Sequence, residues 1–343
     1  MIDKKAWTLK SVAQKLGVSN ATVSNAFNRP DQLSKKRRDE ILESCKEIGY
    51  SGPNRAAQSL RKGHFNIVAL VLPDSVEYMV TDPVASKFVK GVSSVLEQSK
   101  VNLLLFSGTS ENINAVSDFV DGFICYGSPR NTALIEQLRV TNKKVVTADF
   151  DIDRKASVGI DNEQAAYEIA KLALHSKDDA VAILGLRLLD STVTSRVYDL
   201  PGLDYQCSIS HKRLNGYNRA IKEIGVELRS DRVWNIPENK HHFALIAARE
   251  ALTSTPRPNV LLCMSDLIAL AAIQEINAMG LKIPQDIRIV GFDGIDEALR
   301  SQPKLTTIHQ NNEKKGIKAA ELFIERAIES VIIPFHIEHG ETS

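Results

Sequence analysis

The chain has 343 residues, enough for two or three domains, and its 43 basic and 42 acidic side chains nearly balance. This balance favours neither a nucleic-acid nor a membrane partner, and no apolar run reaches the roughly 18 residues of a membrane-spanning helix. We expect no secretory leader. The cysteines lie far apart without metal-ligand spacing, so we expect reduced thiols in a cytoplasmic protein without metal or cofactor: Cys45, Cys125, Cys207 and Cys263.

The first predicted elements are two short helices within residues 8–28. Thr8 can cap the first helix, whose apolar residues recur every three or four positions, and Gly17 can end it in the left-handed conformation. Ser19 can cap the second helix, which leaves short neutral side chains on one face: Asn20, Ala21, Ser24 and Asn25. This face suits close approach to base edges, so the pattern predicts a helix-turn-helix. The alternative is an ordinary helical hairpin.

A third helix is predicted from Ser34 to about Ile48. It opens with the densest basic run of the chain, residues 35–38, which is either a phosphate-contacting face or a solvated one. Residues 1–63 hold 13 Lys and Arg against 6 Asp and Glu, whereas the remainder holds 30 against 36. A basic module on an acidic body is typical of a DNA-binding protein.

Residues 50–61 read Tyr-Ser-Gly-Pro-Asn-Arg-Ala-Ala-Gln-Ser-Leu-Arg, and together with the preceding helices they resemble the LacI family of bacterial transcription regulators. The resemblance implies a hinge helix that folds on operator DNA and inserts Leu60 into the minor groove, with Arg55 and Ala57 on the same face. Without the preceding motif, this segment would be a plain linker helix. The residues expected at the DNA are Thr8, Leu9, Ser19, Asn20, Ala21, Thr22, Ser24, Asn25, Asn28, Ser34, Asn54, Arg55, Ala57 and Leu60.

From residue 66 onward, short apolar strands alternate with helices. Near-continuous apolar strands separated by helices predict parallel sheets covered on both faces, and two such sets in tandem predict two doubly wound lobes. The first set comprises strands at 67–72, 101–106, 123–126, 144–147 and 158–161, with helices at 84–99 and 163–174. The second comprises strands at 180–184, 260–263 and 287–292, with helices at 211–224 and 266–279.

Several strings in this region also resemble the regulatory core of the LacI family, which is similar to periplasmic sugar-binding proteins. Examples are Val-Asp-Gly-Phe-Ile at 120–124, Arg-Leu-Asn-Gly-Tyr at 213–217 and Val-Gly-Phe-Asp-Gly at 290–294. The resemblance implies a small all-α headpiece joined to an α/β core of two lobes. The expected domains are a headpiece at 1–49, a hinge at 50–63, an N-lobe at 64–161 plus 294–325, and a C-lobe at 162–293 plus 326–343.

Ligands bind open parallel sheets outside the carboxyl ends of the strands, which in two facing lobes meet at a cleft. The resemblance places a small effector there, with Arg213 and Asp293 as its main contacts and Asp74, Tyr78 and Asp161 as further ones. A guanidinium and a carboxylate suit hydroxyl groups, and Arg213 also suits an anion. We expect Arg213 and Asp293 to be dispensable for folding. The alternative for Asp161 and Asp293 is a turn or helix cap.

Some positions depart from the family pattern. Ser265 precedes Asp266 where family members have an asparagine. The second helix of the first lobe is cut short, with only residues 107–119 between two strands, and residues 186–210 form a long irregular loop. Because these changes lie near the expected cleft, the family's usual sugar contacts do not carry over directly.

The expected function is that of a homodimeric repressor that binds a near-palindromic operator and responds to a small polar effector. An enzyme is the rival class, but the chain has no GxGxxG, P-loop, GxSxG or HExxH motif, and His241 and His242 lack spaced metal-ligand partners. A second rival is a cytoplasmic sugar-binding receptor whose headpiece serves another role. Failure of the headpiece to bind DNA would favour that receptor.

Overall fold

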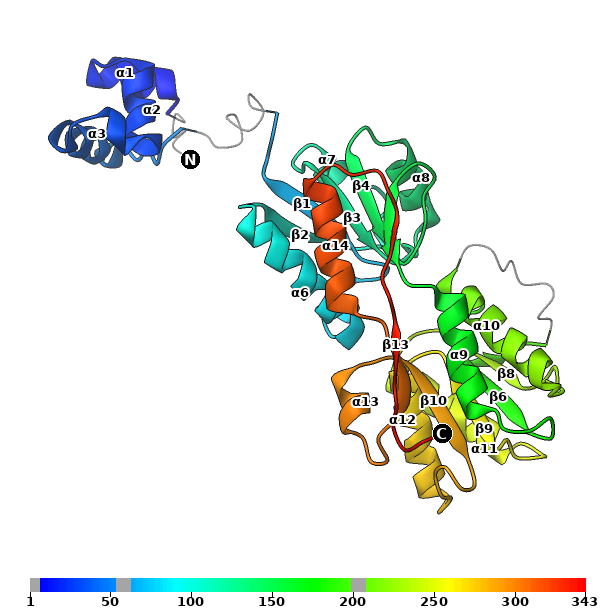
Figure 1. Cartoon of the computed structure of the whole chain (residues 1–343). Coiled ribbons are helices and arrows are strands. Elements are labelled where there is room, and N and C mark those ends of the chain that lie inside the picture. Colours follow the sequence, from blue (N-terminus) through cyan, green and yellow to red (C-terminus); the bar gives the residue numbers. More distant parts are fainter. Residues whose placement is uncertain (1–6, 54–62, 199–207) are drawn as a thin grey trace. The chain divides into compact units, whose positions relative to one another are not determined.

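A computed structural model describes residues 7–53, 63–198 and 208–343. The chain forms two compact units, Met1–Phe65 and Asn66–Ser343, which we treat separately. The first unit is helical (Figure 1). Its elements are α1 (Leu9–Leu16), α2 (Asn20–Asn28), the 3₁₀ helix η1 (Pro30–Gln32) and α3 (Lys35–Glu47).

The helices of the first unit begin and end at the predicted residues. The hydroxyls of Thr8, Ser19 and Ser34 each accept a hydrogen bond from a backbone N–H in the first helical turn. Gly17 ends α1 with φ 62°, a conformation that glycine adopts without steric cost. The apolar faces of α1, α2 and α3 enclose a small core formed by Val12, Ala13, Val23, Ala26, Ile41, Cys45 and Tyr50. The predicted hinge residues Asn54, Arg55, Ala57 and Leu60 lie outside the described residues.

The first lobe of the second unit is built on a six-stranded sheet in the order β12-β5-β4-β3-β1-β2, in which all neighbours are parallel. Residues along β1 alternate between two cores. Val68 and Leu70 face α6 and α14, whereas Ala69 and Val71 face α8. The elements are β1 (Ile67–Val71), α5 (Val76–Met79), α6 (Pro83–Gln98), β2 (Asn102–Phe106), α7 (Asn114–Ser117), β3 (Gly122–Tyr126), α8 (Thr132–Val140), β4 (Lys144–Ala148), β5 (Ala156–Gly159), α14 (Asn312–Ile324) and β12 (Val331–Ile332).

The second lobe is built on a seven-stranded sheet in the order β13-β11-β10-β9-β6-β8-β7. The five central strands are parallel, and β7 and β13 pair antiparallel at the edges. Helices α9 and α10 cover one face, and α11 and α12 cover the other. The elements are α9 (Asn162–Ala173), β6 (Val181–Leu186), β7 (Ser195–Arg196), α10 (Ile209–Ile224), β8 (Val233–Ile236), α11 (His241–Thr253), β9 (Val260–Cys263), α12 (Asp266–Ala278), β10 (Arg288–Asp293), α13 (Asp296–Arg300), β11 (Thr306–His309) and β13 (His336–Glu338).

Each lobe has one pair of helices whose backbones touch at glycines. In the first lobe, a Cβ added to Gly91 of α6 would lie 2.1 Å from the carbonyl oxygen of Glu313, and one added to Gly316 of α14 would lie 2.2 Å from that of Phe88. Figure 1 shows α6 in cyan beside α14 in orange, although they come from distant parts of the chain. In the second lobe, Gly216 of α10 approaches Glu163 of α9 equally closely. Only glycine permits this contact.

The lobe boundaries differ from the expected ones in two places. The assignment of residues 294–325 to the first lobe is wrong for α13 and β11, because β11 pairs with β10 in the second sheet and α13 contacts α12. The assignment of residues 326–343 to the second lobe is wrong for β12, which pairs with β5 in the first sheet. The chain thus crosses between the lobes three times, after β5, β11 and β12. The sheet that a short edge strand joins depends on tertiary packing.

The predicted shortened helix of the first lobe is confirmed, since α7 spans only Asn114–Ser117. The long loop expected at residues 186–210 contains the short edge strand β7, and residues 199–207 of it lie outside the description. Among the described residues, no helix is both long and apolar enough to cross a lipid bilayer.

Candidate functional site

The headpiece exposes the polar face of α2. Asn20, Ala21 and Asn28 are exposed and Ser24 and Asn25 are half-buried, whereas Val23 and Ala26 on the opposite face are buried. None of the side chains on the exposed face carries a charge or a bulky group. An approaching surface can therefore reach the amide groups of Asn20 and Asn25, which pair well with adenine edges.

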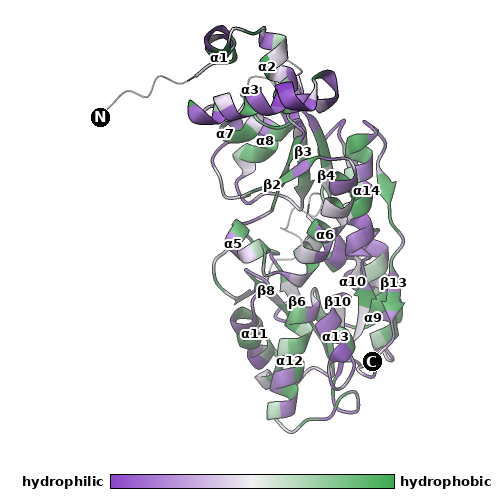
Figure 2. Cartoon of the chain, turned by 90° about the vertical axis from the view of Figure 1, so that its left-hand side faces the viewer, coloured by the Kyte–Doolittle hydropathy of each residue, from purple (hydrophilic) through white to green (hydrophobic). Residues whose placement is uncertain are grey.

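The basic run at the start of α3 divides into two kinds of residue. Lys35, Lys36 and Arg37 are exposed, and α3 is predominantly hydrophilic in Figure 2. Arg38 instead donates from Nε to the carbonyl oxygen of Ala26 at 3.0 Å and so ties α3 to α2. Arg37 pairs with Glu40 at 3.2 Å, so Lys35 and Lys36 are the members of the run best placed to face phosphate groups.

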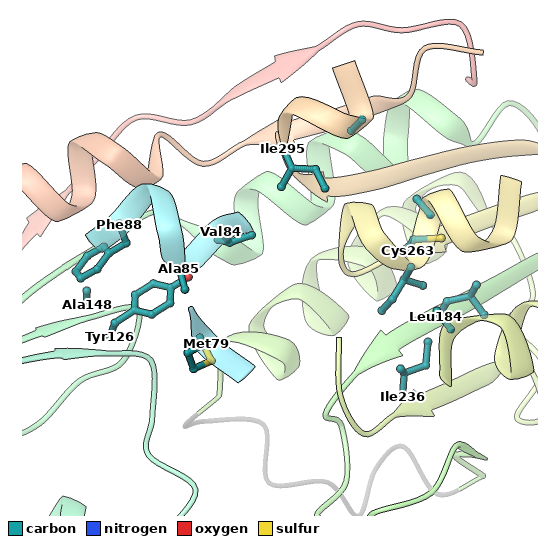
Figure 3. Close-up of a cluster of buried hydrophobic side chains, with 14 of the residues drawn as sticks. Met79, Val84, Ala85, Phe88, Tyr126, Ala148, Leu184, Ile236, Cys263 and Ile295 are labelled. Carbon is teal, nitrogen blue, oxygen red and sulfur yellow. The ribbon is translucent and has the colours of Figure 1, made fainter. Parts of the chain in front are cut away.

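A pocket of about 540 Å³ lies between the two lobes of the core, at the carboxyl ends of the strands of both sheets. Pro73 and Asp74 follow β1, Tyr126 ends β3, and Arg187 follows β6. Figure 3 shows that Met79, Val84 and Tyr126 belong to an apolar cluster, and these three side chains also line the pocket from the first lobe. The order of strands reverses at β1 in the first sheet and at β6 in the second, which is where open parallel sheets bind ligands.

Arg213 and Asp293 form the buried floor of this pocket. Arg213 of α10 donates from Nε to the side-chain oxygen of Asn162 at 3.0 Å and from its terminal nitrogen to the carbonyl oxygen of Met264 at 2.6 Å. The same terminal nitrogen lies 3.8 Å from a carboxylate oxygen of Asp293, and the guanidinium stacks 3.7 Å from the ring centroid of Phe292. The planar guanidinium is thus held rigidly at the pocket surface.

A hydrogen-bonded chain continues from Asp293 into the first lobe. Gln310, which follows β11, donates from Nε2 to Asp293 at 2.6 Å, and Lys315 of α14 donates to Gln310 at 3.0 Å. Lys315 is completely buried and also pairs with Asp149, which follows β4. One carboxylate oxygen of Asp149 is buried without a hydrogen-bond partner. This chain therefore connects the pocket floor to α14 and β4 of the other lobe.

Burial raises the pKa of two carboxyl groups near the floor. Burial raises the pKa of Asp293 well above its ordinary value, and the Arg213 guanidinium opposes this shift. Burial likewise raises the pKa of Asp266 to about 6, although Thr307 and the backbone N–H of Ile295 donate hydrogen bonds to its carboxylate. Of the two, Asp293 lines the pocket, whereas Asp266 is completely buried behind it.

The mouth of the pocket carries paired charges from both lobes. Arg130 of the first lobe lies 3.0 Å from the carboxylate of Asp74 and 3.6 Å from that of Glu238, which follows β8 in the second lobe. Lys240 also pairs with Glu238 and lies over the ring of Tyr78. Contacts across the mouth therefore depend on the distance between the lobes.

The structure brings four of the five predicted effector residues together. Asp74, Tyr78, Arg213 and Asp293 line the pocket, whereas Asp161 does not. Asp161 is the N-cap of α9 and accepts a hydrogen bond from the backbone N–H of Gln164, in agreement with the alternative interpretation as a helix cap. Polar pocket-lining residues that the sequence analysis missed include Asp82, Tyr126, Arg130, Asp149, Arg187, Asn239 and Gln310.

A simple signal identifies most of the missed residues. Asp149, Arg187 and Gln310 each follow a parallel strand directly, and Asn239 lies three residues beyond β8. A search for polar residues behind every strand finds all four, because the carboxyl ends of parallel strands share one edge. Within the described ranges, no group of His, Cys, Asp and Glu has the arrangement of a metal site.

Comparisons with known proteins agree with this arrangement. A sequence model of the lacI family of bacterial regulatory proteins matches residues 8–54, and a periplasmic binding protein-like domain matches residues 197–336. The chain is 34% identical over 330 residues to the HTH-type transcriptional regulator Rv3575c of Mycobacterium tuberculosis, covering 93% of this chain and 90% of that one.

Solved structures share the whole architecture. A LacI-family transcriptional regulator from Silicibacter pomeroyi is 25% identical, with a TM-score of 0.76 over 98% of this chain and 99% of that one. The transcriptional regulator CelR, solved as a cellobiose complex, is 22% identical, with a TM-score of 0.65 over 98% of this chain and 100% of that one. The chain therefore belongs to the LacI family of bacterial transcription regulators, which bind DNA and are not enzymes.

Proposed function

We propose that this regulator is a repressor that binds a near-palindromic operator as a homodimer and that a small polar, sugar-like effector in the interlobe pocket sets its DNA affinity. The observation that carries the proposal is the convergence of Asp74, Tyr78, Arg213 and Asp293 from two separate sheets on one pocket. A pocket with few fixed polar groups and apolar walls is typical of a small-molecule site.

The DNA-binding part of the proposal rests on the headpiece. Helix α2 enters the major groove with the face that contains Asn20, Ala21 and Asn25, and the exposed Lys35 and Lys36 contact phosphates. A dimer places two such helices in successive major grooves. Leu60 inserts into the minor groove from the hinge, as the family resemblance implies.

The effector part rests on the chemistry of the pocket floor. Arg213 is a fixed donor, and the Asp293 carboxyl, one oxygen of which accepts a hydrogen bond from Gln310, lies beside it; this arrangement suits vicinal hydroxyl groups. The volume of about 540 Å³ accommodates one or two sugar rings, and the structurally similar CelR holds cellobiose.

The coupling between the two sites follows from linkage. An effector that contacts residues of both lobes stabilises the lobe arrangement in which those contacts form. The lobe arrangement in turn sets the spacing of the two hinge segments of the dimer, and with it the affinity for the operator. By reciprocity, operator DNA changes effector affinity by the same factor.

A selection experiment tests this proposal. Full-length protein is used to select operator sequences from random duplexes, and operator affinity is then measured by fluorescence anisotropy with and without each member of a sugar and polyol panel. We expect a near-palindromic consensus and an effector that shifts operator affinity about 5- to 150-fold. The variant Asp293→Asn should keep operator binding and lose the response. Sugar binding without any sequence-specific DNA binding would instead favour the sugar-receptor function.

A further inference from the structure

Arg187 lines the pocket but takes part in none of the contacts described above. Arg187 is the first residue after β6 and lies at the reversal of strand order in the second sheet. Its backbone has a φ of 52°, which is uncommon for a residue with a side chain, and its N–H donates to the carbonyl oxygen of Ile236 at 2.8 Å. Strained backbone that the surrounding structure holds in place is typical of ligand sites.

The other guanidinium groups of the pocket have carboxylate partners. Arg130 pairs with Asp74 at 3.0 Å, and Arg213 lies 3.8 Å from Asp293. Arg187 takes part in none of the ion pairs formed among residues 7–53, 63–198 and 208–343, although it is half-buried and lines the pocket. Burial and the neighbouring Arg130 lower its pKa, and the smaller opposing effects of Asp74, Tyr78 and Asp190 do not cancel the shift.

The backbone beside Arg187 is fixed rather than loose. His211, in the first turn of α10, lies with Nε2 3.1 Å from the carbonyl oxygen of Leu188, and the backbone N–H of Leu189 donates to Asn235 at 3.0 Å. Ser191 and Thr192 also line the pocket, although the Ser191 hydroxyl donates to the carbonyl oxygen of Val193 within its own turn. A guanidinium carried on a fixed backbone presents the planar donors that carboxylate and phosphate groups bind.

We propose that the effector of this regulator is anionic, a sugar or polyol that carries a carboxylate or phosphate group, and that Arg187 binds this group. The inference rests on the proposed function of the pocket and specifies its ligand class. The hydroxyl groups of the effector face Arg213 and Asp293 at the floor, and its anion faces the wall formed behind β6. A neutral sugar leaves Arg187 desolvated without a partner, so the pocket discriminates against it.

The test compares matched ligands on matched variants of the full-length protein. The probes are inorganic phosphate and sets that contain one neutral, one carboxylated and one phosphorylated member, such as glucose, glucuronate and glucose 6-phosphate, at constant ionic strength. The variants are Arg187→Gln and Arg187→Lys, with Arg219→Gln as control. Arg219 is an exposed arginine of α10 that lies outside the pocket and pairs with Glu163. Binding is measured by isothermal titration, and thermal unfolding verifies that each variant is folded.

We expect an acidic member to bind at least about tenfold more tightly than its neutral counterpart. The identity of the acidic member that binds distinguishes a carboxylate effector from a phosphate effector. Arg187→Gln should remove this preference, Arg187→Lys should keep part of it, and Arg219→Gln should keep all of it. The inference is overturned if the neutral member binds best and if its affinity is the same for the wild type and for Arg187→Gln. That result leaves the proposed pocket intact. If no probe binds in the pocket, both are overturned.

Discussion

Replacing Arg213 with alanine should destabilise the core as well as abolish the effector response. The side chain is 8% exposed, donates hydrogen bonds to Asn162 and to the carbonyl oxygen of Met264, and faces Asp293. Its removal leaves these buried acceptors without a donor and Asp293 without its positive partner. Removing one partner of a buried, hydrogen-bonded charge pair costs about 3–5 kcal/mol, a large part of the roughly 5–15 kcal/mol that stabilises a typical domain. These buried contacts therefore argue against the expectation from sequence that Arg213 is dispensable for folding.

The size of this loss should depend on pH. Without Arg213, the folded-state pKa of Asp293 rises further above its ordinary value of 3.8, because the group that opposes the shift is gone. A carboxyl group with a raised folded-state pKa costs stability as the pH rises from the unfolded-state pKa to the folded-state pKa. The wild type has the same kind of cost below its own raised pKa, so the extra destabilisation of Arg213→Ala should appear only above the wild-type folded-state pKa of Asp293 and grow with pH from there.

The assay is urea unfolding of the full chain, followed by the fluorescence of Trp234, which is completely buried in the second lobe. Arg219→Ala is the control, because Arg219 lies on the same helix but is exposed and should cost less than about 1 kcal/mol. Adding Asp293→Asn to Arg213→Ala should recover part of the loss by removing the unpaired carboxyl group. Equal stability of the Arg213 and Arg219 variants, or a loss that does not change with pH, would refute the reasoning.

Three further predictions concern other parts of the chain. Asn25→Ala should weaken binding to the selected operator by about 1–3 kcal/mol and leave binding to random DNA unchanged, as measured by anisotropy; equal losses on both would mean that Asn25 only positions the backbone. Burial raises the pKa of Asp266 from 3.8 to about 6, so this carboxyl group lowers the free energy of unfolding by about 3 kcal/mol between pH 4 and pH 7. Asp266→Asn should remove this contribution. If urea unfolding at several pH values gives the same pH dependence of stability for the variant and the wild type, Asp266 does not have this role. Gly316→Ala should destabilise the core by about 3 kcal/mol, because the new Cβ meets the backbone of Phe88 at 2.2 Å. Lys314→Ala, a change at an exposed position of the same helix, should have little effect. Wild-type stability of Gly316→Ala would show that α6 and α14 can separate without cost.

The sequence was sufficient to predict the elements with continuous apolar runs or clear caps. Strands β1, β3, β4, β6, β9 and β10 lie within about two residues of their predicted positions. Helices α1 and α2 begin after their predicted caps, and α3 begins one residue after its predicted first residue, Ser34. It was not sufficient for β8, in which the completely buried Asn235 interrupts the apolar run. A short strand of mixed composition has no periodicity that distinguishes it from a loop.

The candidate site was predictable only in part, because some polar residues that the sequence pattern places at the surface are buried in the structure. Lys315 occurs in the sequence Asn-Asn-Glu-Lys-Lys, which is typical of a solvated helix face, yet its side chain is completely buried. The close contact at Gly316 brings α14 against α6 and β4, and this places Lys315 beside Asp149. Contacts between segments that are 166 residues apart leave no local trace in the sequence.

The contact of α6 with α14 has a consequence for biosynthesis. A ribosome delivers residues 66–159, which include the first five strands, long before it delivers α14 and β12, which complete the same lobe. The second lobe likewise waits for β13 at residues 336–338. Both lobes therefore reach their final form only when the last residues of the chain have been made, and a premature stop codon upstream of β12 removes strands from both sheets at once.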